Sequence, residues 1–133
     1  MKTTRFIAAA TLVIAGALAP EVALAQWQGI KRTDLQRHDL SIPGREVFQV
    51  LVEFAPGVVA PNHSHPGEEI VNVLDGVLVY ELEGRPAVTL RAGEVLFIPA
   101  GTPHKVTNVG SGNAAEIATY IVEKGKPLLV PRK

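Results

Sequence analysis

The chain has 133 residues, with 13 Lys and Arg against 13 Asp and Glu, and it contains no cysteine. This charge balance argues against a nucleic-acid-binding protein, and the lack of cysteine rules out disulfides as a source of stability. The length suits one small domain with a single hydrophobic core.

Residues 1–25 are predicted to form a secretory signal peptide. Basic Lys2 and Arg5 precede an apolar stretch over residues 6–19, which is shorter than the about 20 residues of a membrane-spanning helix. The small-x-small motif Ala23-Leu24-Ala25 then predicts cleavage before Gln26. We expect a periplasmic or secreted protein without stable membrane insertion. The leader has no adjacent arginines, so we expect export of the unfolded chain and metal uptake afterwards. An uncleaved anchor or a buried N-terminal helix is the alternative.

Residues 26–45 are predicted to form an N-terminal arm, because they are polar and lack a regular apolar pattern. Such an arm can cover an open edge of a sheet or reach a partner subunit, and we expect a homodimer. His38 lies in this segment and is predicted to be a surface residue.

Residues 46–123 are predicted to form the main domain, built from short strands. Apolar residues alternate from Glu46 to Phe54, and the dipeptide Asp75-Gly76 predicts a hairpin. The other predicted strands are the His63-x-His65 segment between turns at 56–57 and 66–67, and residues 69–74, 77–82, 88–90, 95–98, 104–108 and 114–122. Many short strands without a helical period indicate an all-β, antiparallel barrel or jelly roll. Residues 124–133 are predicted to be a loosely packed C-terminal tail, because Pro127 and Pro131 disfavour regular structure.

His63 and His65 are the first candidates for metal ligands. Side chains alternate along a strand, so these two imidazoles share one face and lie about 6 to 7 Å apart along the backbone. A carboxylate from Glu69 and a third imidazole from His104 would complete a nitrogen and oxygen shell for a divalent transition metal. The pair alone leaves open an adventitious site, or histidines that only make structural hydrogen bonds.

The spacing around these residues resembles the two motifs of the cupin family. The first motif runs Gly57, five residues, His63-x-His65, three residues, Glu69, six residues, Gly76. The second runs Gly93, five residues, Pro99-x-Gly101, two residues, His104, three residues, Asn108. All ten defining positions are filled, which is more specific than one short motif. The resemblance implies an antiparallel double-stranded β-barrel in which His63, His65, Glu69 and His104 bind one metal ion.

The resemblance leaves the reaction open, because cupins include enzymes of several classes, regulators and storage proteins. Four protein ligands on an octahedral ion would leave two positions for water, substrate or dioxygen, and Fe, Mn, Ni, Zn and Cu all remain candidates. We expect a small metal-dependent enzyme, either dioxygenase-like or an isomerase or lyase acting on a small chelating substrate. The alternative is a non-catalytic module of the cell envelope that binds metal, sugar or another small molecule. No catalytic residue beyond the metal ligands is predicted.

Several other residues have two possible roles. Glu68 is expected to face away from the metal because its neighbour Glu69 faces it, although a ligand or general-base role stays open. Asn62, Tyr80 and Phe97 either line the pocket or belong to the core. Asn108 is expected to make structural hydrogen bonds.

Overall fold

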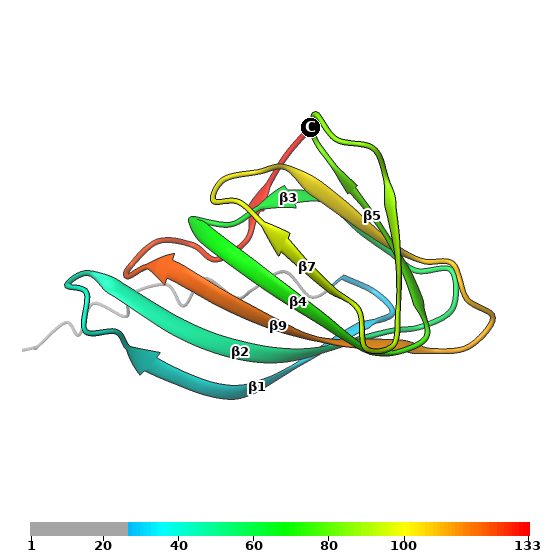
Figure 1. Cartoon of the computed structure of the whole chain (residues 1–133), viewed down its shortest axis with the longest axis horizontal. Helices are drawn as coiled ribbons and strands as arrows, with labels where there is room; N and C mark the ends of the chain where they lie inside the picture. Colours follow the sequence, from blue (N-terminus) through cyan, green and yellow to red (C-terminus); the bar gives the residue numbers. More distant parts are fainter. Residues whose placement is uncertain (1–26) are drawn as a thin grey trace, which may run out of the picture.

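The structure is a computed structural model that describes residues 27–133 (Figure 1). The predicted signal peptide, its cleavage site and Gln26 lie outside the described residues. Within residues 27–133 no helix is long and apolar enough to cross a membrane.

All regular structure in the described residues is β-strand, and every strand pairing is antiparallel. The strands are β1 (Ile30–Asp39), β2 (Arg45–Phe54), β3 (Val59–Ser64), β4 (Gly67–Asp75), β5 (Val77–Leu82), β6 (Val88–Arg91), β7 (Val95–Ile98), β8 (His104–Asn108), β9 (Ala114–Glu123) and β10 (Val130–Pro131). The predicted all-β, antiparallel jelly-roll class is confirmed. The strands expected at 77–82, 95–98 and 104–108 have the predicted bounds.

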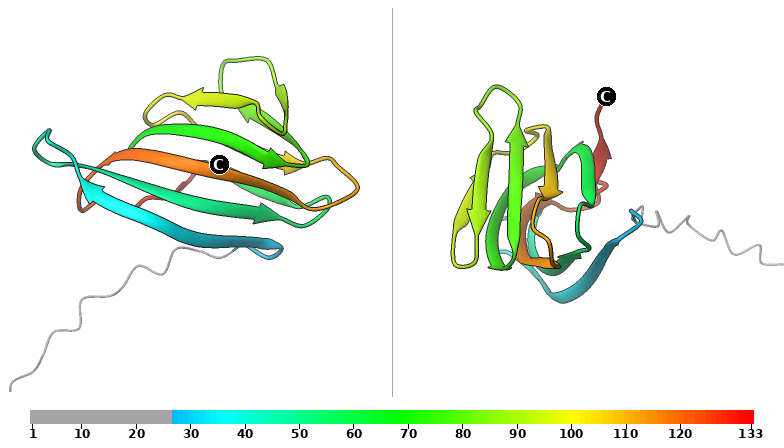
Figure 2. Two further views of the ribbon diagram at one scale, coloured as in Figure 1. Left: turned by 60° about the horizontal axis from the view of Figure 1, so that its bottom comes forward. Right: turned by 90° about the vertical axis from the view of Figure 1, so that its right-hand side faces the viewer.

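Two five-stranded sheets make up the fold. The first, the β9 sheet, has the order β1-β2-β9-β4-β7, and its strands lie side by side in Figure 1. The second, the β8 sheet, has the order β10-β3-β8-β5-β6. The end-on view in Figure 2 shows the two layers with the interior between them. Sequential neighbours along the chain often fall in different sheets, so the site is assembled from residues far apart in sequence.

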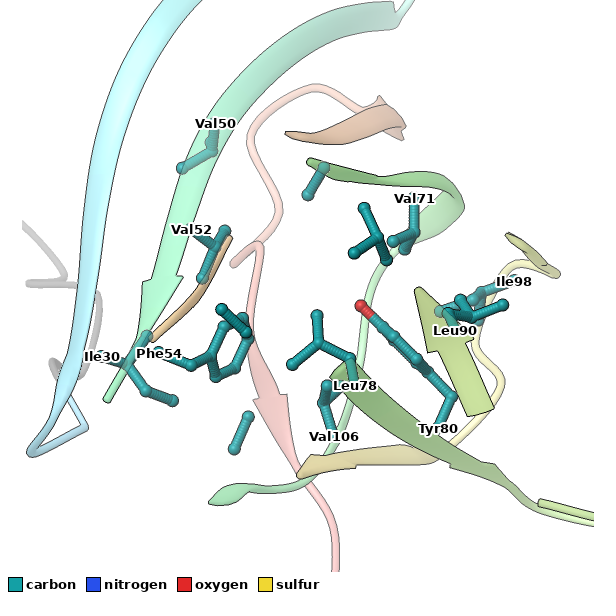
Figure 3. Packing of buried hydrophobic residues seen from close by; sticks show 14 of the residues in the cluster. Ile30, Val50, Val52, Phe54, Val71, Leu78, Tyr80, Leu90, Ile98 and Val106 are labelled. Atoms are coloured by element: carbon teal, nitrogen blue, oxygen red, sulfur yellow. The ribbon is translucent and has the colours of Figure 1, made fainter. Parts of the chain in front are cut away.

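The hydrophobic core fills the space between the sheets (Figure 3). On β2, Val50, Val52 and Phe54 are buried in alternation, which is the period expected of a strand with one inward face. The β8 sheet contributes Leu78 and Tyr80, both almost fully buried. Each fully buried apolar side chain of this size contributes about 1.5 to 3 kcal/mol.

Asp75-Gly76 forms a tight turn, but the predicted hairpin is wrong, because β4 and β5 lie in different sheets and do not pair. The turn predicted at Pro66-Gly67 is confined to its first residue. Gly76 has a φ of 78° beside Asp75, a left-handed conformation that glycine adopts without strain. At the other position the chain bends at Pro66, and Gly67 is already the first residue of β4. A Cβ atom at Gly67 would clash with the carbonyl oxygen of Ile121 on β9, so glycine is needed there for close strand approach.

The two ends of the described chain are more ordered than their composition indicates. Residues 30–39 of the predicted arm form β1, which pairs with β2 at the edge of the β9 sheet. The expectation of a loosely packed tail is wrong, because Leu128 is buried and Val130 and Pro131 pair with β3. Proline is tolerated in β10 because this strand lies at a sheet edge.

Candidate metal site

Three histidines converge at one end of the space between the sheets. His63 on β3 is directly opposite His104 on the neighbouring strand β8, and the centroids of their rings are 4.2 Å apart. His65 follows the end of β3, with its ring centroid 5.0 Å from that of His63. All three side chains are buried, and their nearest ring nitrogens lie within 4.8 Å of one another. Three buried imidazoles at this separation can hold one metal ion.

Each imidazole is oriented by a backbone carbonyl. The Nδ1 atoms of His63, His65 and His104 lie 2.6, 2.8 and 2.9 Å from the carbonyl oxygens of Pro61, Leu128 and Thr102. A carbonyl only accepts, so each Nδ1 donates its proton, and in a neutral ring of this tautomer Nε2 offers its lone pair. This is the arrangement expected of metal-binding histidines.

Glu69 enters the same space from β4 in the opposite sheet. Its Oε2 atom lies 3.1 Å from Nε2 of His65 and 3.3 Å from Nε2 of His104. Neighbouring donor atoms around an octahedral ion are separated by about 3 Å when each bond is about 2.1 Å long. The spacing between Glu69 and these two histidines therefore fits a shared ion.

Two of these atoms lack a hydrogen-bond partner among residues 27–133. Nε2 of His65 and Oε2 of Glu69 are both fully buried without one. A buried polar atom left unsatisfied costs about 1 to 3 kcal/mol, and more when charged, so such atoms in a native fold indicate a water or an ion that satisfies them. The donor set fits a divalent transition metal.

Burial and neighbouring charges shift the acidities of the site. Burial, followed by the proximity of His104 and His65, lowers the pKa of His63 to about 3, so His63 is neutral and able to bind metal at ordinary pH. Burial alone would raise the pKa of Glu69, but the adjacent His65 and His104 outweigh it and hold that pKa well below its usual range. Glu69 is therefore an anion.

A small cavity of about 20 Å³ adjoins the site and is lined by residues from both sheets. This volume holds about one water-sized particle. Glu116 on β9 lines the cavity and accepts a short hydrogen bond from the Tyr80 hydroxyl on β5. Burial, followed by the charge of Glu69, raises the pKa of Glu116 to about 8. Glu116 can therefore hold and release a proton near neutral pH.

Arg32 and Tyr120 line the same cavity from the β9 sheet. Nη2 of Arg32 donates to the Tyr120 hydroxyl across 3.2 Å, and the Tyr120 ring lies 4.7 Å from that of His65. Sequence reasoning missed Arg32, Glu116 and Tyr120. A signal was present, because Glu116 and Tyr120 are in phase with Ala118 and the other buried residues of β9.

The remaining predicted residues fall outside the site, apart from Tyr80, which is buried and reaches it through Glu116. Asn62 donates to the carbonyl of Lys133 at the surface, and Phe97 is 52% exposed, so neither lines the small cavity. Glu68 is half-buried with no hydrogen bond to the histidines, and His38 is exposed as expected. Asn108 is fully buried, and its side-chain amide donates to the carbonyls of Phe54, Ala55 and Gly112. Its structural role is therefore confirmed.

Comparison with known proteins agrees with this geometry. A family model described as a cupin domain matches residues 50–122, more than half of the chain. The chain belongs to the cupin family. The matched segment includes the three histidines, Glu69 and Glu116, whereas Arg32 lies before it.

Similar proteins include enzymes of two classes. Germin-like protein 1-1 of Oryza sativa subsp. japonica is 39% identical over 88 residues, 60% of this chain and 41% of the relative. Dimethylsulfoniopropionate lyase DddQ of Ruegeria pomeroyi is 39% identical over 54 residues, 41% of this chain and 27% of the relative. A solved structure of recombinant oxalate oxidase in complex with glycolate has a TM-score of 0.64 and 29% identity, and the match covers 80% of this chain and 57% of that one. The chain thus spans less than two thirds of each of these proteins.

Proposed function

We propose that this cupin is a small metal-dependent enzyme that acts on a small chelating substrate, with His63, His65, Glu69 and His104 as metal ligands. The observation that carries the proposal is the pair of orphaned buried atoms, Nε2 of His65 and Oε2 of Glu69, which lie 3.1 Å apart, with Oε2 also 3.3 Å from Nε2 of His104. Oxalate oxidase and the DddQ lyase among the similar proteins support an oxidoreductase or a lyase.

Glu116 favours an enzyme over a passive site. A divalent ion bound by the four ligands would polarise a chelating oxygen of the substrate or acidify a bound water. Glu116 lines the cavity beside those ligands and has its pKa raised to about 8, so it can accept or donate a proton there. Tyr80 donates to Glu116 and fixes its carboxyl group in the cavity.

The test combines metal analysis with a turnover screen. Protein purified from its native compartment should contain one transition metal per chain, and chelating carboxylic acids and diketones should be screened for oxygen consumption and for product formation. Glu116→Gln should retain the metal and lose most turnover. Glu83 is exposed and directly follows β5, so Glu83→Gln should retain both the metal and the turnover. A chain that holds no metal contradicts the proposal.

The second candidate function is that of a non-catalytic module that binds metal or a small molecule, and the small cavity favours it. A volume of about 20 Å³ admits little beyond water or a very small ligand. In that case the protein should bind metal with the same ligands, and Glu116→Gln should leave metal and ligand binding unchanged with no turnover to lose.

Export is part of the proposal and rests on the sequence of residues 1–25. Mass spectrometry of the cellular protein should find an N-terminus near Gln26, and an intact Met1 to Ala25 segment would contradict export.

A site that fills outside the cytoplasm should follow the Irving–Williams order, which favours zinc, nickel or copper over iron and manganese. Elemental analysis of exported and leaderless protein should therefore differ, and identical metals would show that geometry selects the ion.

A homodimer is also proposed, supported by apolar residues on the outer face of the β9 sheet. Ile70 on β4 is opposite Phe97 on β7, and both are exposed, as is Val95 on the same strand. Exposed apolar clusters of this kind mark association surfaces. Light scattering should give a dimer mass for the wild type and a monomer mass for Phe97→Glu.

A further inference from the structure

Arg32 has a buried hydrogen-bond donor with no acceptor. Its Nη2 donates to the Tyr120 hydroxyl, but its Nε is fully buried and unpaired among the described residues. Arginine cannot shed its proton at any ordinary pH, so neutralisation cannot relieve this cost. The side chain lines the cavity that also contains His63, Glu69 and His104.

Strand β1 directs Arg32 into the cavity. Ile30 and Arg32 are two residues apart, so they point to the same face, and Ile30 is part of the hydrophobic core. Arg32 is paired in register with Val52 of β2, which is also in the core. Arg32 therefore points to the same side as core residues and lies beside the candidate metal site. The exposure of an edge strand to solvent does not explain a cation in that position.

We propose that Arg32 and Tyr120 form an anion-binding end of the metal cavity and take the carboxylate of a small substrate. The inference rests on the proposed function, since it names the substrate class of the same site. A carboxylate has two oxygens, so it can accept from Nε of Arg32 and still offer an oxygen to the metal. The cavity volume of about 20 Å³ limits the substrate to a very small carboxylate.

Charge compensation for a buried carboxylate is the competing explanation of Arg32. Arg32 does lie near enough to Glu116 to interact electrostatically with it. The only hydrogen bond of its guanidinium group to another side chain in residues 27–133 goes to Tyr120, and Nε stays unpaired. A countercharge accounts for the charge of Arg32 but leaves the unpaired donor unexplained.

The experiment uses the full mature chain loaded with zinc and titrated with formate. Formamide is the control ligand, because it has nearly the same size and no charge. Trp27 is the only tryptophan, lies 4.9 Å from His63 between ring centroids and lines the cavity, so its fluorescence reports binding together with calorimetry. The variants are Arg32→Gln, Arg32→Lys and the exposed neighbour control Lys31→Gln.

Formate should bind the wild type more tightly than formamide, and Arg32→Gln should weaken formate binding about tenfold to hundredfold, the loss expected for one charge-assisted hydrogen bond. Arg32→Lys should fall between, and Lys31→Gln should match the wild type. Zinc content should be equal in all four proteins. Equal binding of formate and formamide by the wild type, or unchanged formate affinity in zinc-loaded Arg32→Gln, overturns this inference but leaves the proposed metal function standing. A wild type that holds no zinc overturns the proposed metal function and this inference with it.

Discussion

The two sheets contribute different chemistry to the same cavity. The β8 sheet and the link that follows β3 supply three imidazoles, each fixed by a backbone carbonyl. The β9 sheet supplies the ionisable groups that face them, namely Glu69, Glu116 and Arg32, together with the Tyr120 hydroxyl. The β8 side thus supplies the nitrogen donors, whereas the β9 sheet supplies one carboxylate donor, Glu69, and the other charged groups around them. Variants in the two sheets should therefore fail in different ways.

The largest effect is expected from the imidazoles of the β8 sheet. His63→Ala or His104→Ala removes a proposed ligand and leaves a void in a buried site, so metal content should fall to a small fraction of one ion per chain. The hydrophobic core does not include either side chain, so circular dichroism should still show a β-rich fold. Full metal content in both variants would remove the histidines as ligands.

The carboxylates of β4 offer the next comparison. Glu69→Gln removes the anion 3.1 Å from His65 and should weaken metal binding by more than about a hundredfold, the upper end of the loss for a residue that only orients a ligand. Glu68→Gln alters a half-buried neighbour directed the other way, and it should change metal affinity less than about twofold. The reverse order would show that Glu68, not Glu69, is the ligand.

The C-terminal tail holds one imidazole of the β8 sheet and should give a smaller effect. The carbonyl of Leu128 accepts from Nδ1 of His65, and Arg132 donates to Ser64 beside it. A chain ending at Lys126 loses both contacts and should bind metal about tenfold to hundredfold more weakly. A chain ending at Leu129 keeps the carbonyl and should bind within a few-fold of the wild type. Equal affinities for the two truncations would mean that the tail does not orient His65.

The difference between the sheets also explains what the sequence could predict. The three histidines and Glu69 stand at fixed spacings within two short motifs, and most strands have clear turns at their ends. Arg32 and Glu116 are single charged residues in strands, and a charge in a strand is most often on the solvent side. Their positions depend on the pairing of β1 with β2 and of β2 with β9, contacts between segments far apart in the chain. The tail was mispredicted for the same reason, since its order depends on pairing with β3.

The smallest effect, and the most direct contrast between the sheets, is expected in the pH dependence of stability of the metal-free protein. His63 has its pKa lowered from 6.5 to about 3, so between these values the unfolded chain binds a proton that the folded chain does not, and stability falls as the pH is lowered. Glu116 has its pKa raised from 4.5 to about 8, so between these values the folded chain keeps a proton that the unfolded chain loses, and stability falls as the pH is raised.

Between pH 4.5 and 6.5 the two slopes oppose each other, which predicts a plateau in the free energy of unfolding. From pH 6.5 to 8, Glu116 alone should lower stability by about 1.4 kcal/mol per pH unit, while below pH 4.5 His63 lowers it and the depressed pKa of Glu69 adds to the fall. Urea unfolding in the presence of a chelator measures this profile. Glu116→Gln should flatten the alkaline side and leave the acid side intact, and the exposed control Glu83→Gln should change neither. An alkaline slope that survives in Glu116→Gln would show that this carboxyl group is not the one that keeps its proton in the folded cavity.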